Sequence, residues 1–526
     1  MRIAGSVFLL AIWSVGLNLN AQVTTQDLEA GPGQNWLTYI GDYAAKRYSP
    51  LKEIDSSSIS RLVPKWVRHF EGAGDLEATP LVDDGVMYTT SSNELYALDA
   101  VTGREIWHYS AVGSQRHGVN RGAAILGEQV FFTTADCHLV ALRRNNGAIL
   151  WDREYASRSE GYGCSGAPLA VKDKLIVGVA SSGRTCFVAA LYAANGNEAW
   201  RVWSVPHEGE LGSETWGHFP LNQGGGPTWT TGSYDPKLNL LYWPTGNPWP
   251  DFYGGDRPGD NLYTDSVLAL DADTGKMKWH FQFVPHDTHD WDANETPVLL
   301  DTKFQGQERK LLIQANRNGF YYVLDRVTGK FLMGKPFVKD LNWAKGLDAK
   351  GRPIKLPNTD PSPAGAHVCP SVHGATNWWA PSLNPDLGMF YVVALEQCET
   401  YYSSTQKPVP NSGFRGTGHN IIPGQPGQFY LRAIGATTGE IRWEFPMPGP
   451  TTMWAGTVAT AGGLVFSADD DGDLVAFSAE TGKALWHFYT GSHLHASPMT
   501  FSVNGRQYVA MAAGTNLFTF GLQDSH

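Results

Sequence analysis

Long uninterrupted hydrophobic runs are missing from most of this 526-residue sequence. Beyond the N-terminal segment, no stretch reaches the roughly 18 consecutive apolar residues that a membrane-spanning helix requires, which excludes such a helix there. One short apolar run, at positions 7–13, follows Arg2 and precedes a small residue, Ala21. This arrangement is typical of a secretory signal peptide. We therefore expect residues 1–21 to be removed and the remainder to be periplasmic or secreted.

Positive charge is also scarce in this sequence. The chain has 40 Lys and Arg residues against 51 Asp and Glu residues, and its formal net charge is -11. It contains no stripe of basic residues that could neutralise a phosphate backbone, which excludes a nucleic-acid partner.

Cysteine is rare, with five residues in the chain: Cys137, Cys164, Cys186, Cys369 and Cys398. Disulfides suit an exported protein, but an odd number leaves at least one thiol without an intrachain partner, and the pairing of the first three stays open. A Cys-x-x-Cys-His motif is absent, because the Cys-His pair at 137–138 has Thr134 in place of the first cysteine. A covalently attached c-type haem is therefore excluded.

Sustained helical periodicity is hard to find, and short strand-like runs recur instead. Seven of them end in a turn that closes with glycine, and a tryptophan follows four residues later in six cases. The glycines are Gly103, Gly147, Gly196, Gly275, Gly329, Gly439 and Gly482, and Met333 replaces the tryptophan after Gly329. Since glycine supplies the positive φ of a tight turn, each unit is predicted to be an antiparallel hairpin.

The spacing of these glycines predicts the architecture. They are separated by 44, 49, 79, 54, 110 and 43 positions, and a spacing near 45 is that of a four-stranded propeller blade. We expect the 110-residue step to hold two blades, with residues 382–393 in the one that lacks the marker. The sequence thus predicts an all-β protein in which residues 22–526 form a single eight-bladed β-propeller of four-stranded antiparallel blades. The recurrent tryptophans are expected to pack between blades.

Residues 285–292, with the sequence PHDTHDWD, combine three carboxylates, two imidazoles and an indole. They follow a predicted strand, turn and strand over 266–283 and so fall on a loop. Asp290 and Asp292 are two positions apart, which on an extended backbone places both side chains on one face. Two such anions repel unless a cation or a shared proton lies between them. The stretch is either a hard-metal site with one carboxylate acting as a base, or a solvated acidic turn.

The two histidines of this stretch, His286 and His289, raise the possibility of a zinc site. No third nitrogen or sulfur ligand follows at a spacing usable for zinc. We therefore expect both histidines to support the loop rather than to bind a metal.

Several further stretches occur in a fixed order along the chain: NW at 35–36 with RYSPL at 47–51, GGGPTW at 224–229, YWPTGNP at 242–248, and the PHDTHDWD stretch. Together with WAG at 454–456 and GGLVF at 462–466, they resemble the type I quinoprotein alcohol dehydrogenases. These are methanol- and ethanol-oxidising enzymes that use pyrroloquinoline quinone (PQQ). The resemblance extends over nearly all of the sequence after residue 21.

The resemblance implies roles for individual residues. Trp229 matches the indole on which the quinone stacks, Asn247 matches a metal ligand, and Asp290 matches the catalytic base, which also binds the metal. Asp292 matches the additional carboxylate of lanthanide-dependent members, so the implied ion is Ca²⁺ or a lanthanide. Arg317 matches an arginine bonded to the quinone oxygens. Other implied cofactor contacts are Glu77, Arg121, Ser165, Asn377 and Trp454, and Cys369 and Cys398 match a disulfide pair.

These residue types suit quinone chemistry. A quinone carbonyl becomes a hydride acceptor when a cation polarises it, and a hard cation takes oxygen ligands. A guanidinium beside the quinone oxygen stabilises the charge that develops there, and an ionised Asp takes the alcohol proton. Each residue also has a structural alternative: Trp229 as a core residue, Asn247 as the first residue of a turn, and Arg317 in an ion pair between blades.

Two departures from the family pattern bear on function. The adjacent cysteines of the family are replaced by QRHG at 115–118, so no vicinal disulfide can form there. The family's glutamate metal ligand has no counterpart either, because the sequence from Val177 to Cys186 contains no acid and Arg184 adds a positive charge. Loss of a carboxylate weakens a hard-ion site. Either Asp292 compensates for the lost charge, or the metal site itself is lost.

We therefore expect a periplasmic PQQ-dependent dehydrogenase that oxidises an alcohol or a related hydroxy compound and passes electrons to a separate cytochrome c or similar acceptor. One alternative is a quinoprotein-like propeller with an altered metal site that binds a ligand without turnover. Another is a scaffold propeller for protein assembly. The cap over the pocket is expected to come from insertions at 342–363 and 406–428.

Overall fold

The computed structural model describes residues 22–111, 118–181, 183–404, 415–449, 454–469 and 471–524. The predicted signal peptide at 1–21 lies outside these residues, as do positions 115–117 of the QRHG segment and 406–414 of the second insertion. The described chain contains one α-helix, α1 (Thr25–Ala30), four short 3₁₀ helices and forty strands. It is therefore all-β, as predicted. None of the described helices has the length and apolar character needed to cross a membrane.

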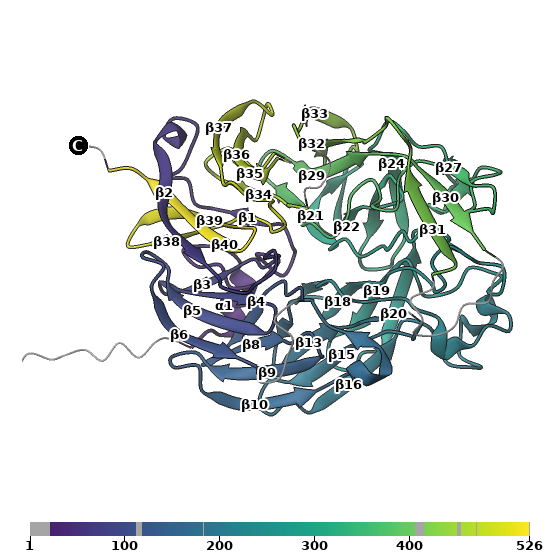
Figure 1. The fold of residues 1–526 in the computed structure, drawn as a ribbon, viewed down its shortest axis with the longest axis horizontal. Helices are drawn as coiled ribbons and strands as arrows, with labels where there is room; N and C mark the ends of the chain where they lie inside the picture. Colours follow the sequence, from purple (N-terminus) through teal and green to yellow (C-terminus); the bar gives the residue numbers. More distant parts are fainter. Residues whose placement is uncertain are drawn as a thin grey trace, which may run out of the picture.

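Eight of the described sheets have four or five strands, and Figure 1 shows them arranged around a common centre. We call these eight sheets blades, and in chain order the first two contain β3 (Leu81–Asp83), β4 (Val86–Ser91), β5 (Glu94–Asp99) and β6 (Glu105–Ser110), and then β7 (Ala123–Leu126), β8 (Gln129–Thr133), β9 (His138–Arg143) and β10 (Ile149–Glu154). The third and fourth blades contain β12 (Leu169–Val171), β13 (Lys174–Gly178), β15 (Phe187–Tyr192) and β16 (Glu198–Trp203), and then β17 (Ser233–Asp235), β18 (Leu240–Pro244), β19 (Ser266–Asp271) and β20 (Met277–Gln282). The fifth blade contains β21 (Val298–Phe304), β22 (Gln307–Ala315), β23 (Phe320–Asp325) and β24 (Phe331–Pro336).

The other three blades contain strands from more distant parts of the chain. They are β28 (Ser382–Asn384), β29 (Met389–Glu396), β32 (Gln428–Gly435) and β33 (Ile441–Pro446); β34 (Val458–Thr460), β35 (Leu464–Ala468), β36 (Asp473–Ser478) and β37 (Ala484–Tyr489), with β1 (Tyr48–Ser49) parallel to β34; and β38 (Met499–Val503), β39 (Arg506–Ala513) and β40 (Asn516–Leu522) with β2 (Leu62–His69). Smaller sheets are formed by β11 (Tyr162–Gly163) with β14 (Ala180–Ser181), by β25 (Ala344–Leu347) with β26 (Pro353–Lys355), and by β27 (Ala366–Val368), β30 (Glu399–Ser403) and β31 (Thr417–Ile421).

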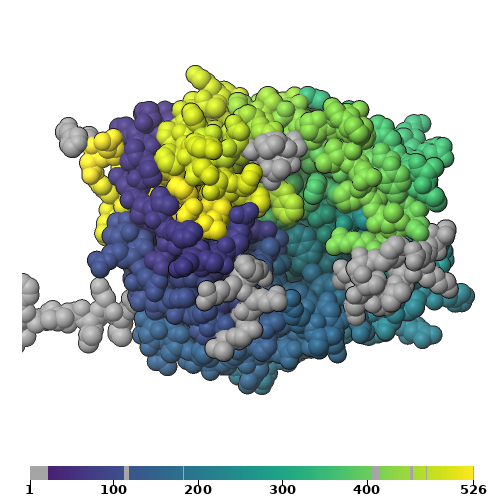
Figure 2. Space-filling view, viewed as in Figure 1, coloured from purple at the N-terminus to yellow at the C-terminus, as the bar shows by residue number. Residues whose placement is uncertain are grey.

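Strand β2 closes the ring by joining the two ends of the described chain. It runs antiparallel to β40, with Leu62 opposite Leu522 and His69 opposite Asn516. Figures 1 and 2 show this purple N-terminal segment beside the yellow C-terminal strands. Closure of the ring pairs strand edges that would otherwise be exposed, and it places the connecting loops around one axis.

The predicted position of the unmarked blade is wrong, although eight blade-like sheets are present. Residues 382–393 lie in β28 and β29, which belong to the same sheet as β32 and β33 and therefore to the blade marked by Gly439. The long step before Gly439 holds one blade and the extra strands β25–β27, β30 and β31. The eighth sheet instead combines β38–β40 with β2. Sequence spacing could not reveal a blade assembled from both ends of the chain.

Five of the six recurrent tryptophans pack against the glycine turn of the next blade, and the sixth, Trp486, donates its indole N–H to the Leu62 carbonyl at 3.1 Å, which confirms their structural role. In one example, the Trp107 indole N–H donates to the Arg144 carbonyl at 2.8 Å. A Cβ atom on Gly147, whose φ is +68°, would lie 2.6 Å from the same indole ring. The glycine therefore satisfies both the turn and the close approach of the ring. The other pairs are Trp66–Gly103, Trp151–Gly196, Trp200–Gly275, Trp279–Gly329, Met333–Gly439 and Trp443–Gly482.

Candidate active site

Loops between the blade strands line a cavity of about 850 Å³. The predicted site residues on its wall are Arg121, Trp229, Asn247, Asp290, Asp292, Arg317, Asn377 and Trp454. Two predicted cofactor contacts, Glu77 and Ser165, reach this site through Arg121. The Arg121 guanidinium lies 2.7 Å from the Glu77 carboxylate and donates to the Ser165 hydroxyl at 2.6 Å. These two residues therefore position an arginine on the wall.

Three loops come together at the carboxylate of Asp292. The Trp229 indole N–H donates to Asp292 Oδ2 at 3.2 Å, and the Asn247 backbone N–H donates to Oδ1 at 2.9 Å. A Cβ atom on Gly246 would lie only 1.7 Å from Oδ1, so this position has room for glycine alone. The GGGPTW, TGNP and PHDTHDWD motifs therefore meet at one carboxylate.

Asp290 reaches the same cavity in a backbone conformation that the sequence did not predict. Its φ is +62°, whereas an extended backbone had been expected to align it with Asp292. Asp tolerates the left-handed conformation better than most residues. Burial raises the pKa of the Asp290 carboxyl well above its usual range, and repulsion from Asp251 and Asp292 raises it further, while Arg317 and Arg415 oppose the shift. Without a cation, this carboxyl therefore favours its protonated form.

Arg317 connects several groups of the site. One terminal nitrogen lies 3.4 Å from the Asp292 carboxylate and donates to the Asn377 side-chain oxygen at 2.9 Å. The other donates to the Asp290 carbonyl at 3.0 Å. Its Nε also lies 3.9 Å from Glu295, whose pKa is raised to about 8 because the carboxyl is buried. Arg317 therefore holds the PHDTHDWD loop in place while lining the cavity.

Asp251 and Arg415 line the cavity but were not predicted. Asp251 accepts a hydrogen bond from the Asn247 side-chain nitrogen at 2.9 Å, and burial raises its pKa to about 6. Arg415 lies 3.5 Å from Asp251 and 3.6 Å from Asp290. No sequence pattern identifies the pair, because it joins the β18–β19 connection to the β30–β31 connection across the fold. Trp378 and His373 also line the wall and were likewise missed.

The wall formed by Ala180 and Ser181 carries no carboxylate, consistent with the absence of acids from the sequence there. Arg184 was expected to bring positive charge to the site. It instead lines a separate cavity of about 190 Å³, together with Trp203 and His207. The Arg184 guanidinium therefore does not bring its positive charge into the cavity that the carboxylates line.

The two histidines of the PHDTHDWD loop support its shape, as expected. The His289 ring stacks on Trp291 with a centroid distance of 4.3 Å, and one ring nitrogen lies 2.7 Å from the Thr359 carbonyl. A ring nitrogen of His286 lies 2.9 Å from the Gly259 carbonyl.

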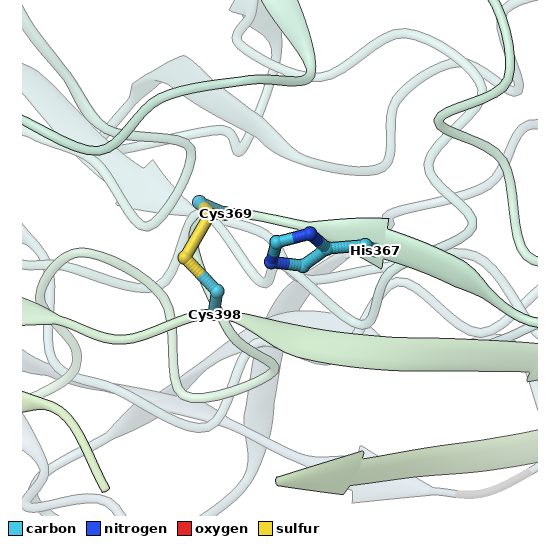
Figure 3. Close-up of side chains that lie close together, drawn as sticks. All are labelled: His367, Cys369 and Cys398. Carbon is cyan, nitrogen blue, oxygen red and sulfur yellow. A yellow bond between two sulfur atoms is a disulfide. The ribbon is translucent and has the colours of Figure 1, made fainter. Parts of the chain in front are cut away.

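The structure contains two disulfides, Cys137–Cys164 and Cys369–Cys398, and Cys186 is a buried thiol. The first resolves the pairing that the sequence left open, and the second agrees with the family resemblance. Figure 3 shows His367 beside the Cys369–Cys398 bridge. Within the described ranges, this is the one group of three His, Cys, Asp or Glu residues whose ligand atoms all lie within 4.8 Å of one another. Because the two sulfurs are bonded to each other, it is not a metal site.

The cavity fits a flat, acceptor-rich group with a cation beside it. The Arg121 guanidinium lies 4.6 Å from the Trp229 ring and 4.3 Å from the Trp378 ring, so a planar group already fits between the two indoles. The buried Trp378 Nε1 and Arg317 Nε are donors on this wall without a hydrogen-bond partner. Unpaired buried donors indicate a ligand that brings acceptors. The carboxylates of Asp251, Asp290 and Asp292 offer anionic oxygens to a hard cation.

An all-β propeller with this donor and carboxylate set defines a quinoprotein type of site, and comparison with known proteins supports this class. The model of the PQQ family, "Glucose/ethanol/alcohol dehydrogenase, beta-propeller domain", matches residues 36–335 and 428–509. Quinoprotein alcohol dehydrogenase PedH from Pseudomonas putida is 38% identical over 504 residues, covering 89% of this chain and 84% of the relative. Quinoprotein ethanol dehydrogenase from Pseudomonas aeruginosa is 33% identical, covering 96% and 90%.

Solved structures agree with the sequence relatives. A europium-containing methanol dehydrogenase superposes with a TM-score of 0.86 at 29% identity, covering 95% of this chain and all of that chain. The quinohemoprotein alcohol dehydrogenase from Comamonas testosteroni gives a TM-score of 0.89 at 31% identity, covering 96% and 83%. The chain therefore belongs to the PQQ-dependent quinoprotein alcohol dehydrogenase family.

Proposed function

We propose that this protein oxidises an alcohol or a related hydroxy compound with bound PQQ, assisted by a Ca²⁺ or lanthanide ion. The observation that carries the proposal is the convergence of Trp229, Asn247, Asp290 and Asp292 on one cavity. Family membership supports the cofactor and the substrate class. The europium-containing relative supports a lanthanide as one candidate ion.

When bound, PQQ supplies a two-electron acceptor and the cation polarises its carbonyl. Trp229 would offer the flat face under the ring, and Arg121, Arg317 and Asn377 would bind its oxygens. Oxygens of Asn247, Asp290 and Asp292 would hold the ion. Both hydrogens of the Asn247 amide donate to protein oxygens, to Asp251 and to the Pro248 carbonyl, so its amide oxygen is the atom that remains for a ligand.

Asp290 is the proposed base for the substrate hydroxyl. Its carboxylate lines the cavity, and the alcohol proton would pass to one of its oxygens as the substrate is oxidised. Arg317 and Arg415 favour the ionised form that a base requires but only partly oppose the burial that raises the pKa of Asp290, so the bound cation would supply the remaining positive charge. Arg317 would keep the base in position through its hydrogen bond to the Asp290 carbonyl.

The proposed location is the periplasm, and the proposed electron acceptor is a separate cytochrome c or similar protein. The signal-peptide pattern at 1–21 and the two disulfides support export to an oxidising compartment. The absence of a Cys-x-x-Cys-His motif from the sequence supports a separate acceptor rather than a covalently attached haem in this chain.

The test is reconstitution of the purified protein with PQQ and either CaCl₂ or LaCl₃, followed by dye reduction with a panel of primary alcohols. We expect PQQ-dependent dye reduction, and Asp290→Asn should abolish it while leaving PQQ absorbance on the protein. Quinone absorbance with no dye reduction by the unaltered protein for any alcohol would favour the binding-only alternative. Absence of both signals would favour a scaffold role.

A further inference from the structure

We infer that Asp251 is a further carboxylate ligand of the proposed cation site, and that Arg415 competes with the cation for Asp251 and Asp290. This inference rests on the proposed function, because it adds two residues of this chain to the same site. Neither residue lies in one of the sequence motifs that predict the site.

Asp251 lies on the cavity wall with the other carboxylates, and its second oxygen takes no part in the hydrogen bond to Asn247. It is 8% exposed and lines the cavity with Asn247, Asp290 and Asp292. Its Oδ1 accepts the hydrogen bond from the Asn247 side chain at 2.9 Å, which fixes both residues relative to each other. Its Oδ2 points to Arg415 instead, at 3.5 Å from Nε. A carboxylate held at one oxygen and paired with a displaceable charge at the other is suited to bind an ion.

Arg415 occupies the space between two of the carboxylates. Its Nε is 3.5 Å from Asp251 Oδ2 and its Nη1 is 3.6 Å from Asp290 Oδ2. A cation bound by both carboxylates would need to lie between the same oxygens. The backbone of Arg415 is tied to this loop, because the Phe252 N–H donates to its carbonyl at 2.9 Å. The side chain, however, is 53% exposed, so the guanidinium can turn into solvent without leaving a buried space.

The distribution of charge around the cavity indicates an ion rather than an ordinary ion pair. The wall at Ala180 and Ser181 offers no carboxylate, so the anionic oxygens of the cavity come from Asp251, Asp290 and Asp292. Arg317 already pairs with Asp292, and Arg415 is shared between two acids at distances longer than a direct hydrogen bond. Hard cations require several anionic oxygens, which Asp251 would help to supply. The donors Trp378 Nε1 and Arg317 Nε on the same wall have no hydrogen-bond partner, which indicates a ligand that brings acceptors beside the ion.

The test measures cation binding directly rather than activity. The protein, loaded with PQQ, is titrated with CaCl₂ and with LaCl₃ by isothermal titration calorimetry, for the unaltered chain and for four variants. Asp251→Asn keeps an oxygen that accepts the Asn247 hydrogen bond but removes the charge, and we expect it to weaken binding by about tenfold or more. Arg415→Gln should strengthen binding several-fold, whereas Arg415→Lys, which keeps the charge, should not. Asp256→Asn, on the same loop and exposed, is the charge-matched control and should bind like the unaltered protein.

Three outcomes would overturn the inference. Equal affinity of Asp251→Asn and the unaltered protein would remove Asp251 from the site while leaving the proposed function intact. Weaker binding by Arg415→Gln would contradict the competition. If neither the unaltered protein nor Asp256→Asn binds Ca²⁺ or La³⁺ in the presence of PQQ, the metal site of the proposed function is refuted, and the inference with it. Thermal unfolding of each variant checks the fold. If Asp251→Asn does not fold, the comparison of Arg415→Gln with Arg415→Lys decides.

Discussion

The carboxylate of Asp292 depends on three neighbours that each contribute a different physical property. Trp229 and Asn247 each donate one N–H to it, and hydrogen bonds to an ionised acceptor are stronger than neutral ones. Gly246 contributes only the space that a side chain would fill. Because the donors come from separate loops, Asp292 also joins the loops that would hold the ring and the ion.

Replacing Gly246 by alanine tests this need for space. The added Cβ would lie 1.7 Å from Asp292 Oδ1 and must displace the carboxylate. We expect Gly246→Ala to lose cation affinity by about tenfold or more, measured by calorimetry on the PQQ-loaded protein. Gly74→Ala is the control, since nothing lies within 4 Å of the added Cβ there. Equal affinity of the two variants would show that the carboxylate adapts.

Glu295 provides a pH-dependent contribution to stability. Burial raises its pKa to about 8 in the folded chain, above the usual value of a glutamate. Between the unfolded and folded pKa values, the folded state therefore holds the proton more tightly. Stability falls as pH rises through that range, by up to about 1.4 kcal/mol per pH unit. Glu295→Gln should remove this loss, measured as a smaller decrease in the free energy of urea unfolding between pH 5 and 8. An unchanged pH slope would contradict the protonated state of Glu295.

At the scale of elements, the contact between a tryptophan and the next glycine turn links one blade to its neighbour. The signal is local in sequence, so seven blades could be recognised from it. The eighth could not, because its extra strand β2 pairs with β40 from the other end of the chain and Trp66 lacks a preceding glycine marker. For the same reason Asp251 and Arg415 were missed: their contact exists only after distant loops meet.

The contribution of the Trp–Gly contact to stability can be measured separately from the backbone strain of the positive φ in the turn. Gly147 and Gly127 have similar positive φ values of +68° and +62°, but a Cβ meets the Trp107 ring only at Gly147. Gly127→Ala should lose about 1 kcal/mol of unfolding free energy through backbone strain. Gly147→Ala should lose roughly 1–3 kcal/mol more through overpacking. Urea denaturation of both variants measures the difference, and equal losses would contradict a steric role for the tryptophan.

At the scale of the whole molecule, ring closure by β2 and β40 brings loops from most of the chain around a single cavity. The rigid blades fix where each loop begins and ends, while the loops supply the chemistry. The family motifs allowed eight wall residues to be predicted, because each motif marks its own loop. The motifs do not encode how charge is distributed among the loops, for example that the wall at Ala180 has no acid while Asp251 contributes a carboxylate.

The most direct test of the account is a crystal structure of the protein with PQQ and LaCl₃, with the lanthanum located by its anomalous scattering. The account predicts one strong peak within bonding distance of oxygens from Asn247, Asp290 and Asp292, beside a quinone ring lying on Trp229. A lanthanum peak away from these residues, or a ring bound elsewhere on the propeller, would contradict it.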